Sequence, residues 1–253
     1  MKTVVISDVH GRSVWKLITR MENADRVIFL GDYFDSYEIS AAEQIYNFQE
    51  IINFKETSFT NSGKSDQHKT KVILLIGNHD YGYFSGIDGT KTSGYQINLA
   101  PSINIVLEEN KHHMQMAYQF DKFLFTHAGV SEVFMNDIFG INEWKIENLV
   151  SDLNDLFKYK PQSFMFNTAD RMGFGDYEHQ SPIWIRPRSL MKAGKLDREL
   201  KKHVIQIVGH TKQDKIDIKG KATGNRYYFT DTQETSGEYL VIENGVVKIG
   251  NTR

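Results

Sequence analysis

The sequence contains no cysteine, and this absence limits the chemistry of any functional site. It excludes a disulfide framework, a thiolate nucleophile and zinc sites that are built on cysteine. Any metal ion must therefore be held by histidine, aspartate, glutamate or asparagine side chains.

An excess of charge of either sign is also missing. Thirty basic residues stand against 32 acidic residues, so the formal net charge is −2. Such a balance creates no long-range field that would attract nucleic acid or an anionic membrane. We therefore expect no membrane partner, and the sequence gives no sign of nucleic-acid binding.

The N-terminus lacks a long apolar run. The chain reaches a carboxylate at Asp8, too early for a signal peptide or a membrane-spanning helix, and we expect a cytoplasmic location. A chain of 253 residues with 40% hydrophobic content can bury a large core. At this length we expect a single domain over residues 1–253.

The N-terminal part predicts a βαβ unit. Residues Thr3–Ile6 and Arg26–Leu30 are strand-like, and the stretch Ser13–Ala24 between them has helical spacing at Val14, Leu17, Ile18 and Met21. Such a unit favours parallel strands joined by a right-handed crossover. The sequence therefore predicts an α/β fold.

Further elements follow the same logic of apolar periodicity and turn residues. They are a helix at Ser40–Lys55, a surface loop at Thr57–Thr70, strands at Lys71–Ile76, Phe123–Thr126 and Val204–Val208, a mostly helical stretch at Ser131–Lys160, and antiparallel strands at Arg226–Thr230, Glu238–Glu243 and Val246–Ile249.

Five of the expected strands run directly into residue types that bind metals. These residues are Asp8 and His10, Asp32 and Asp35, Asn78 with His79 and Asp80, His127, and His210. In an α/β sheet, ligands bind at the carboxyl ends of the strands, so these side chains should converge. Each one alone has a structural explanation as a helix cap, a turn residue or a buried histidine. Their repetition at one topological place favours a metal site.

The number of candidate ligands indicates two ions. A single catalytic ion takes three or four protein ligands, whereas the candidates are Asp8, His10, Asp32, Asn78, His127 and His210. Two ions can share a carboxylate and a water that loses a proton to become a nucleophilic hydroxide. Hydrolysis of a phosphoester is the chemistry that this arrangement suggests.

The motifs D-x-H, G-D-x-x-D, G-N-H-D, a lone histidine and G-H resemble those of the calcineurin-like metallophosphoesterases, nearest the Ser/Thr protein phosphatase and dinucleoside tetraphosphatase branch. The resemblance extends from Asp8 to about Asp231-Thr232. It implies a β-sandwich flanked by helices, with a binuclear metal site at the C-terminal ends of the strands. It favours manganese, while the ligand types also suit iron or zinc.

The resemblance also implies roles for individual residues. Asp32 would bridge two ions, the first also bound by Asp8 and His10, and the second also bound by Asn78, His127 and His210. His79 would protonate the leaving oxygen, and Asp35 would orient its imidazole. Arg186 would bind the phosphate, with Arg188 as the alternative.

Two positions depart from the family pattern. Ser36 stands where this branch usually has arginine, and Arg171, Arg188 and Lys91 are candidates to replace it. Lys212 stands where nuclease-like relatives have a second histidine, which argues against that branch.

The remaining histidines, namely His68, His112, His113, His179 and His203, are expected to be structural or on the surface. Four tyrosines in the motif loops could stack on a substrate or simply wall the pocket, namely Tyr33, Tyr37, Tyr81 and Tyr83.

Three functions stay open at this point. The first is a metal-dependent phosphomonoesterase, which the complete ligand set and the single-histidine last motif favour. The second is a phosphodiesterase or dinucleoside polyphosphate hydrolase, which the missing arginine at Ser36 favours. The third is a non-catalytic metal-binding scaffold, against which His79 and Asp35 argue. The substrate would be a phosphorylated small molecule, a nucleotide or a phosphoprotein.

Overall fold

The apolar strands bury both of their faces, as the computed structural model shows for residues 1–60, 70–87, 92–170, 173–220 and 226–253. In β1 (Lys2–Ile6), Val4 and Ile6 belong to one apolar cluster and Val5 to another. Because successive side chains of a strand point to opposite faces, this alternation separates two apolar layers. One layer lies between a sheet and its helices, and the other lies between two sheets.

The first sheet contains the N-terminal strands and the C-terminal hairpin. β1 lies at its centre, parallel to β2 and antiparallel to β10. Its strand order in the described residues is β11 (Val246–Asn251), β10 (Glu238–Glu243), β1, β2 (Arg26–Phe29), β3 (Lys71–Leu75) and β4 (Met114–Gln115).

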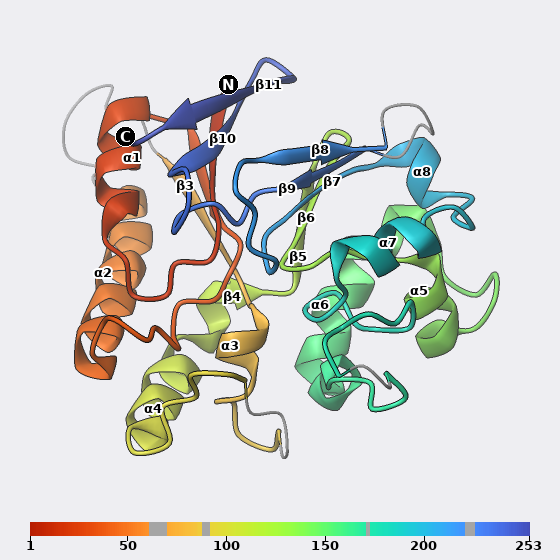
Figure 1. Ribbon diagram of the computed structural model, residues 1–253, viewed down its shortest axis with the longest axis horizontal. Helices are drawn as coiled ribbons and strands as arrows, with labels where there is room; N and C mark the ends of the chain where they lie inside the picture. The colour runs from red at the N-terminus through yellow and green to blue at the C-terminus, as the bar shows by residue number, and fades with distance from the viewer. Residues whose placement is uncertain (61–69, 88–91, 171–172, 221–225) are drawn as a thin grey trace.

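The second sheet packs face to face with the first through Phe125 and Ile207, which meet Val5 and Ile28 in the shared apolar layer. Its strand order in the described residues is β5 (Ala117–Phe120), β6 (Phe123–Thr126), β7 (Ile205–Val208), β9 (Arg226–Phe229) and β8 (Asp217–Lys219). The expected sandwich is therefore present (Figure 1).

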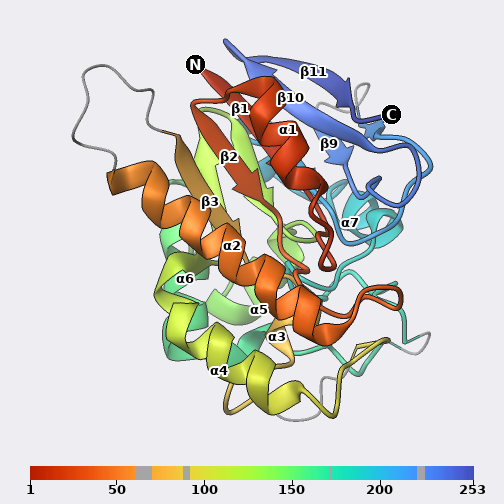
Figure 2. The ribbon, with the colours of Figure 1, turned by 90° about the vertical axis from the view of Figure 1, so that its left-hand side faces the viewer.

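Helices cover the outer faces of the sandwich. α1 (Val14–Glu22) and α2 (Ala41–Thr60) lie on the first sheet (Figure 2), and α7 (Pro187–Ala193) packs on the second. The other helical segments are α3 (Asn78–Tyr81), α4 (Ala100–Asn110), η1 (Lys111–His113), α5 (Glu132–Phe139), η2 (Ile146–Asn148), α6 (Leu149–Tyr159), η3 (Pro161–Phe164) and α8 (Leu200–His203). No helix in the described ranges has the length and apolar character needed to cross a membrane.

Some sequence predictions need correction. The α2 helix continues to Thr60, so the first residues of the expected loop are helical, and residues 61–69 lie outside the described part. The stretch expected to be mostly helical is so, but it is divided after Phe139, where Gly140 takes a φ of 96°. In α1, Leu17 and Met21 are exposed.

The strand β9 is the most consequential correction. It was expected to be antiparallel, but it pairs in parallel with β7 and only its other edge pairs antiparallel with β8. The parallel strands β6, β7 and β9 therefore end at one edge of the second sheet, as β1, β2 and β3 do in the first. Ser7 Oγ donates to Thr230 O at 2.5 Å, which joins the end of β1 to the end of β9.

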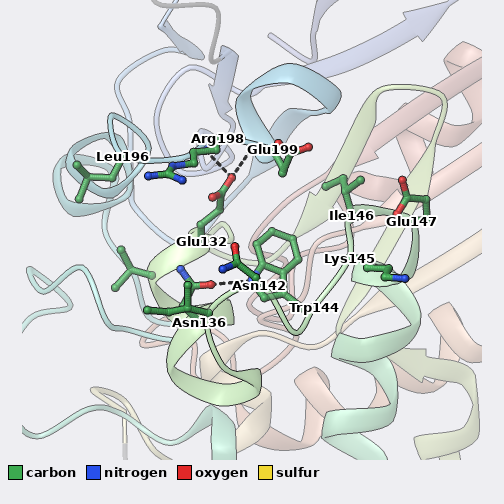
Figure 3. A pocket seen from close by; sticks show the side chains of 12 residues that line it. Glu132, Asn136, Asn142, Trp144, Lys145, Ile146, Glu147, Leu196, Arg198 and Glu199 are labelled. Carbon is green, nitrogen blue, oxygen red and sulfur yellow. Dashed lines mark hydrogen bonds between the residues drawn. The ribbon is translucent and has the colours of Figure 1, made fainter.

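Two buried carboxylates connect α5 to α8 at some distance in sequence from the strand-end motifs. Glu132 Oε1 accepts hydrogen bonds from the backbone N–H groups of Arg198, Glu199 and Leu200, as Figure 3 shows in part. In return, Asp197 Oδ1 accepts from Glu132 N at 3.1 Å. Glu132, Arg198 and Glu199 line a cavity of about 630 Å³, together with Trp144 and Lys145. None of the sequence-predicted site residues lines this cavity.

The Asp197 carboxylate makes the stability of this contact depend on pH. Asp197 has no exposed surface, and burial, with the neighbouring Glu132 charge, raises its pKa to about 7. In the unfolded chain an aspartate has a pKa of about 3.9. The folded state therefore keeps this proton up to a higher pH than the unfolded state does. The stabilisation from this group is lost as the pH rises from about 4 to about 7.

We predict that Asp197→Asn removes this pH dependence. The asparagine oxygen can still accept from Glu132 N, but the side chain no longer titrates. The melting temperature of the variant minus that of the wild type should therefore increase between pH 5 and pH 8. Asp214→Asn, at an exposed aspartate, is the control. A difference that stays constant across this range would contradict the prediction.

Candidate metal centre and active site

The loops after the strands have unusual backbone conformations. Five residues of the predicted site have positive φ angles, which non-glycine residues rarely adopt: Asp8 (48°), His10 (41°), Asp32 (55°), Asp35 (68°) and His210 (67°). Each such residue costs on the order of 1–3 kcal/mol, and the surrounding structure must hold it in place. Strain of this kind gathers at functional sites, which agrees with the position of these loops.

Two glycines leave the space that the carboxylates occupy. A Cβ atom on Gly77 would lie 2.0 Å from Asp32 Oδ1, and a Cβ atom on Gly209 would lie 2.1 Å from Asp8 Oδ2. Any side chain at these positions would displace a carboxylate. This explains physically why glycine precedes Asn78 and His210 in their motifs.

The Asp32 carboxylate lies at the centre of the predicted site. Its Oδ2 atom is 3.3 Å from His127 Nε2 and 3.8 Å from His10 Nε2. Two groups of possible ligand atoms, each within 4.8 Å of one another, share Asp32: one adds His10 and His79, and the other adds Asp8 and His127. A carboxylate that belongs to both groups can bridge two ions. The groups differ from the expected division of ligands, since Asp8 lies with His127, and His10 lies with His79.

The other predicted ligands lie beside this carboxylate. Asn78 Oδ1 is 2.9 Å from His127 Nε2 and 2.9 Å from His210 Nδ1. Asp8 Oδ1 accepts from His210 N at 2.9 Å, while its Oδ2 is buried and has no hydrogen-bond partner in the described structure. A bound cation or a proton would stabilise an unpartnered buried carboxylate oxygen. The donor set of carboxylate, amide and imidazole groups therefore fits divalent metal ions.

The electrostatics of the cluster point the same way. Burial raises the pKa of Asp8 well above its usual value, and the charges of Asp231 and Asp32 add to this. Burial also raises the pKa of Asp32, but His127, His79 and His10 outweigh it, so the net shift is downward. Burial and the neighbouring His127 lower the pKa of His210 well below its usual value. Crowded carboxylates beside imidazoles of lowered pKa, such as His10 and His210, form a site that bound cations would stabilise.

The structure also joins His79 to Asp35. His79 Nδ1 lies 2.9 Å from Asp35 Oδ2, and the Asp35 side chain is fully buried. Burial lowers the pKa of His79, but the charges of Asp32 and Asp35 outweigh it and raise the pKa overall. A protonated imidazole held by a carboxylate can act as a proton donor through its other ring nitrogen.

The arginines of the predicted site differ in their position. The Arg186 Nε donates to Phe174 O, and the charge of Arg186 is one of the smaller contributions to the lowered pKa of His210. Arg188 is exposed. Arg171 and Lys91 lie outside the described residues. Ser36 is buried, and its Oγ accepts from Glu38 N and Ile39 N at 3.2 Å, so it has a structural role in its loop.

The tyrosines and remaining histidines are mostly structural. Tyr33 and Tyr81 have no exposed surface and cannot stack on a substrate, whereas Tyr37 is 79% exposed. His113 Nε2 lies 3.2 Å from Glu56 Oε1, and His179 Nδ1 lies 2.5 Å from Asp137 Oδ2. His112 and His203 are exposed, and His68 lies outside the described residues.

Sequence reasoning missed two aspartates of the site. Asp231 follows β9 and raises the pKa of Asp8 through its charge. The same strand-end signal was available in the sequence, but the expected antiparallel pairing placed this residue at the wrong edge. Asp80 was noted as part of a motif but received no role. Its carboxylate accepts from Asp32 N (2.8 Å), Tyr33 N (2.7 Å) and Gly77 N (2.9 Å), and so it holds the Asp32 loop against the Gly77 loop.

We predict that Asp80→Asn destabilises the fold by about 1 to 3 kcal/mol, because one buried N–H group then faces a donor instead of an acceptor. Burial and the charge of Asp32 raise the pKa of Asp80 to about 7, so the comparison belongs at pH 8. Thermal unfolding in the presence of a chelator measures the effect on the protein alone. The exposed Asp176→Asn variant is the control. Equal melting temperatures for Asp80→Asn and the wild type would show that these bonds contribute little.

Comparison with solved structures shows the same fold in phosphatases. A cold-active protein-tyrosine phosphatase of a psychrophile Shewanella sp. gives a TM-score of 0.63 at 18% identity, covering 99% of this chain and 77% of that chain. A protein serine/threonine phosphatase from Saccharomyces cerevisiae gives a TM-score of 0.57 at 11% identity, covering 100% of this chain and 80% of that chain. At these identities the likeness establishes the fold alone.

The family comparison goes further. No curated protein sequence matches the chain. The family model described as calcineurin-like phosphoesterase, however, matches residues 1–233. That span contains every strand-end motif and the whole Asp32 cluster. The chain therefore belongs to the calcineurin-like phosphoesterase family, the family that its motifs resemble, and is a metal-dependent phosphoester hydrolase.

Proposed function

We propose that this enzyme is a phosphomonoesterase whose two metal ions share Asp32. The observation that carries the proposal is the place of Asp32 in both groups of possible ligand atoms. The proposed ligands are the six residues found at the strand ends, namely Asp8, His10, Asp32, Asn78, His127 and His210. Two divalent ions, when bound, supply positive charge for the phosphate oxygens and acidify water.

In the proposed reaction His79 donates a proton to the leaving oxygen. Its Nδ1 is engaged by Asp35 at 2.9 Å, so Nε2 is the nitrogen that can face the substrate. Asp35 thereby fixes the tautomer and favours the charged imidazole. Arg186, whose charge contributes to the lowered pKa of His210, binds the oxygens of the phosphate by a bidentate contact.

Preference for monoesters rests on the last motif. It reads Gly209-His-Thr-Lys212 and lacks the second histidine that is usual in nuclease-like relatives. The runner-up is a phosphodiesterase or dinucleoside polyphosphate hydrolase. It is favoured by Ser36, which is buried in its own loop and brings no guanidinium to the phosphate. Manganese as the metal, the cytoplasmic location and the single-domain organisation stay predictions.

The first experiment compares p-nitrophenyl phosphate with bis(p-nitrophenyl) phosphate. The protein is stripped with a chelator and refilled with manganese, zinc or iron. We expect turnover of the monoester to return with metal, most strongly with manganese. In His79→Asn we expect turnover of phenyl phosphate, whose leaving group is poor, to fall by roughly 10²- to 10⁴-fold, and turnover of p-nitrophenyl phosphate to fall far less. Faster turnover of the diester would select the runner-up. Absence of turnover in the refilled protein would contradict the proposal.

A second experiment tests the phosphate contact of Arg186. Arg186→Lys keeps the charge but loses the bidentate geometry. The lost contact is worth about 1.5 to 3 kcal/mol, so we expect kcat/KM to fall roughly 10- to 100-fold. Arg188→Lys, at the exposed arginine two positions on, is the matched control and should keep wild-type activity. An equal loss in both variants, or a loss in Arg188→Lys alone, would reject Arg186 as the phosphate ligand.

A further inference from the structure

The Asp35 carboxylate has more partners than His79. Thr92 Oγ1 donates to Asp35 Oδ2 at 2.5 Å, and the Tyr83 hydroxyl donates to Asp35 Oδ1. Together with His79, these two side chains converge on a carboxylate that has no exposed surface. The position of this carboxylate is therefore set by groups outside the G-D-x-x-D motif.

The Tyr83 hydroxyl can donate in only one direction. It accepts a hydrogen bond from Gln96 N at 2.7 Å, so its own proton must point to Asp35. The ring is 3% exposed and stacks on Tyr95 at 4.4 Å between centroids, with an interplanar angle of 9°. The ring centroid of Tyr83 also lies 6.1 Å from that of Phe34, in an edge-on contact. The packing thus leaves the hydroxyl little freedom to leave Asp35.

The segment Thr92–Gln96 packs directly on the Asp35 loop. Gly94 has a φ of 81°, and a Cβ atom there would lie 3.0 Å from Asp35 O. Gln96 Nε2 donates to Ser36 O at 3.3 Å. The segment therefore contacts Asp35 through both its backbone and its side chains. Thr92 belongs to this segment, and the packing of the segment brings its hydroxyl to Asp35.

We infer that Tyr83 and Thr92 are positioning residues for His79, because they hold the Asp35 carboxylate with one oxygen facing His79 Nδ1. This inference rests on the proposed role of His79. A carboxylate free to rotate would let the imidazole turn, and the proton on Nε2 would lose its direction. Held by two hydroxyl groups, Asp35 keeps that proton aimed at the substrate.

Tyr83 and Thr92 support the step in which the leaving group departs from phosphorus as an alcohol. Water adds to phosphorus, and the bond from phosphorus to the leaving oxygen breaks with its electron pair on that oxygen. The leaving oxygen takes the proton from His79 Nε2. The attacking water releases one proton to solvent, and His79 regains one from solvent. A good leaving group needs this proton little, whereas a poor leaving group depends on it.

The test uses this difference between leaving groups. Tyr83→Phe and Thr92→Val remove one hydroxyl each and keep the shape of the side chain. In the manganese-refilled enzyme, we expect kcat for phenyl phosphate, which has a poor leaving group, to fall roughly tenfold or more. For p-nitrophenyl phosphate, which has a good leaving group, kcat should change little, and KM should change little for both. His79→Asn should show the same selectivity, more strongly.

Tyr81→Phe is the matched control. Tyr81 is as buried as Tyr83, and its hydroxyl donates to Pro161 O at 2.7 Å rather than to Asp35. A structural effect alone would lower the melting temperature in Tyr81→Phe and Tyr83→Phe without changing leaving-group selectivity. The double variant Tyr83→Phe with His79→Asn should be no slower on phenyl phosphate than His79→Asn, because both act on one proton transfer.

Two outcomes separate the inference from the proposed function. If His79→Asn is selective for leaving group but Tyr83→Phe and Thr92→Val are not, the inference is wrong and the role of His79 stands. If His79→Asn itself shows no selectivity, the proposed acid is wrong and the inference falls with it. Should Tyr83→Phe not fold, Thr92→Val decides alone, because Thr92 is only partly buried and valine has its shape.

Discussion

The burial of the Asp32 carboxylate between histidines from separate strands is the interaction on which the site depends. His127 comes from the second sheet and His10 from the first, yet both imidazoles point at the same oxygen of Asp32. A buried carboxylate is stable only with partners of opposite charge or with donors. The two sheets must therefore end at one edge, and the order of parallel strands in each sheet provides this.

The local structure around Asp32 follows from the same requirement. Backbone strain at Asp8 and Asp32 turns the loops sharply so that their carboxylates approach, and Gly77 and Gly209 leave the necessary space. Asp80 compensates for part of the strain, since it accepts three backbone N–H groups from the loops on either side. Strained loops that are fixed by buried hydrogen bonds hold the candidate metal ligands in place.

Much of the fold and the candidate site could be predicted from the sequence. The strand-end motifs lie in contiguous segments, so a single apolar run followed by Asp8 or His127 already indicates where these side chains lie. The β9 strand could not be assigned in this way, because its parallel neighbour β7 is about 20 residues earlier and its pairing depends on packing. Asp231 was missed for that reason. Asp35 was matched with His79 by family resemblance, while Tyr83 and Thr92 have no motif to mark them.

The sequence by itself determined the residue types at the strand ends, the absence of thiolate chemistry and the α/β class, because each depends on composition or on neighbours along the chain. The tertiary structure alone decided that Tyr33 and Tyr81 are buried, that Arg188 is exposed, and that the Thr92–Gln96 segment covers Asp35. These facts depend on contacts between segments far apart in sequence, whose geometry is fixed only when the sheets and loops pack together.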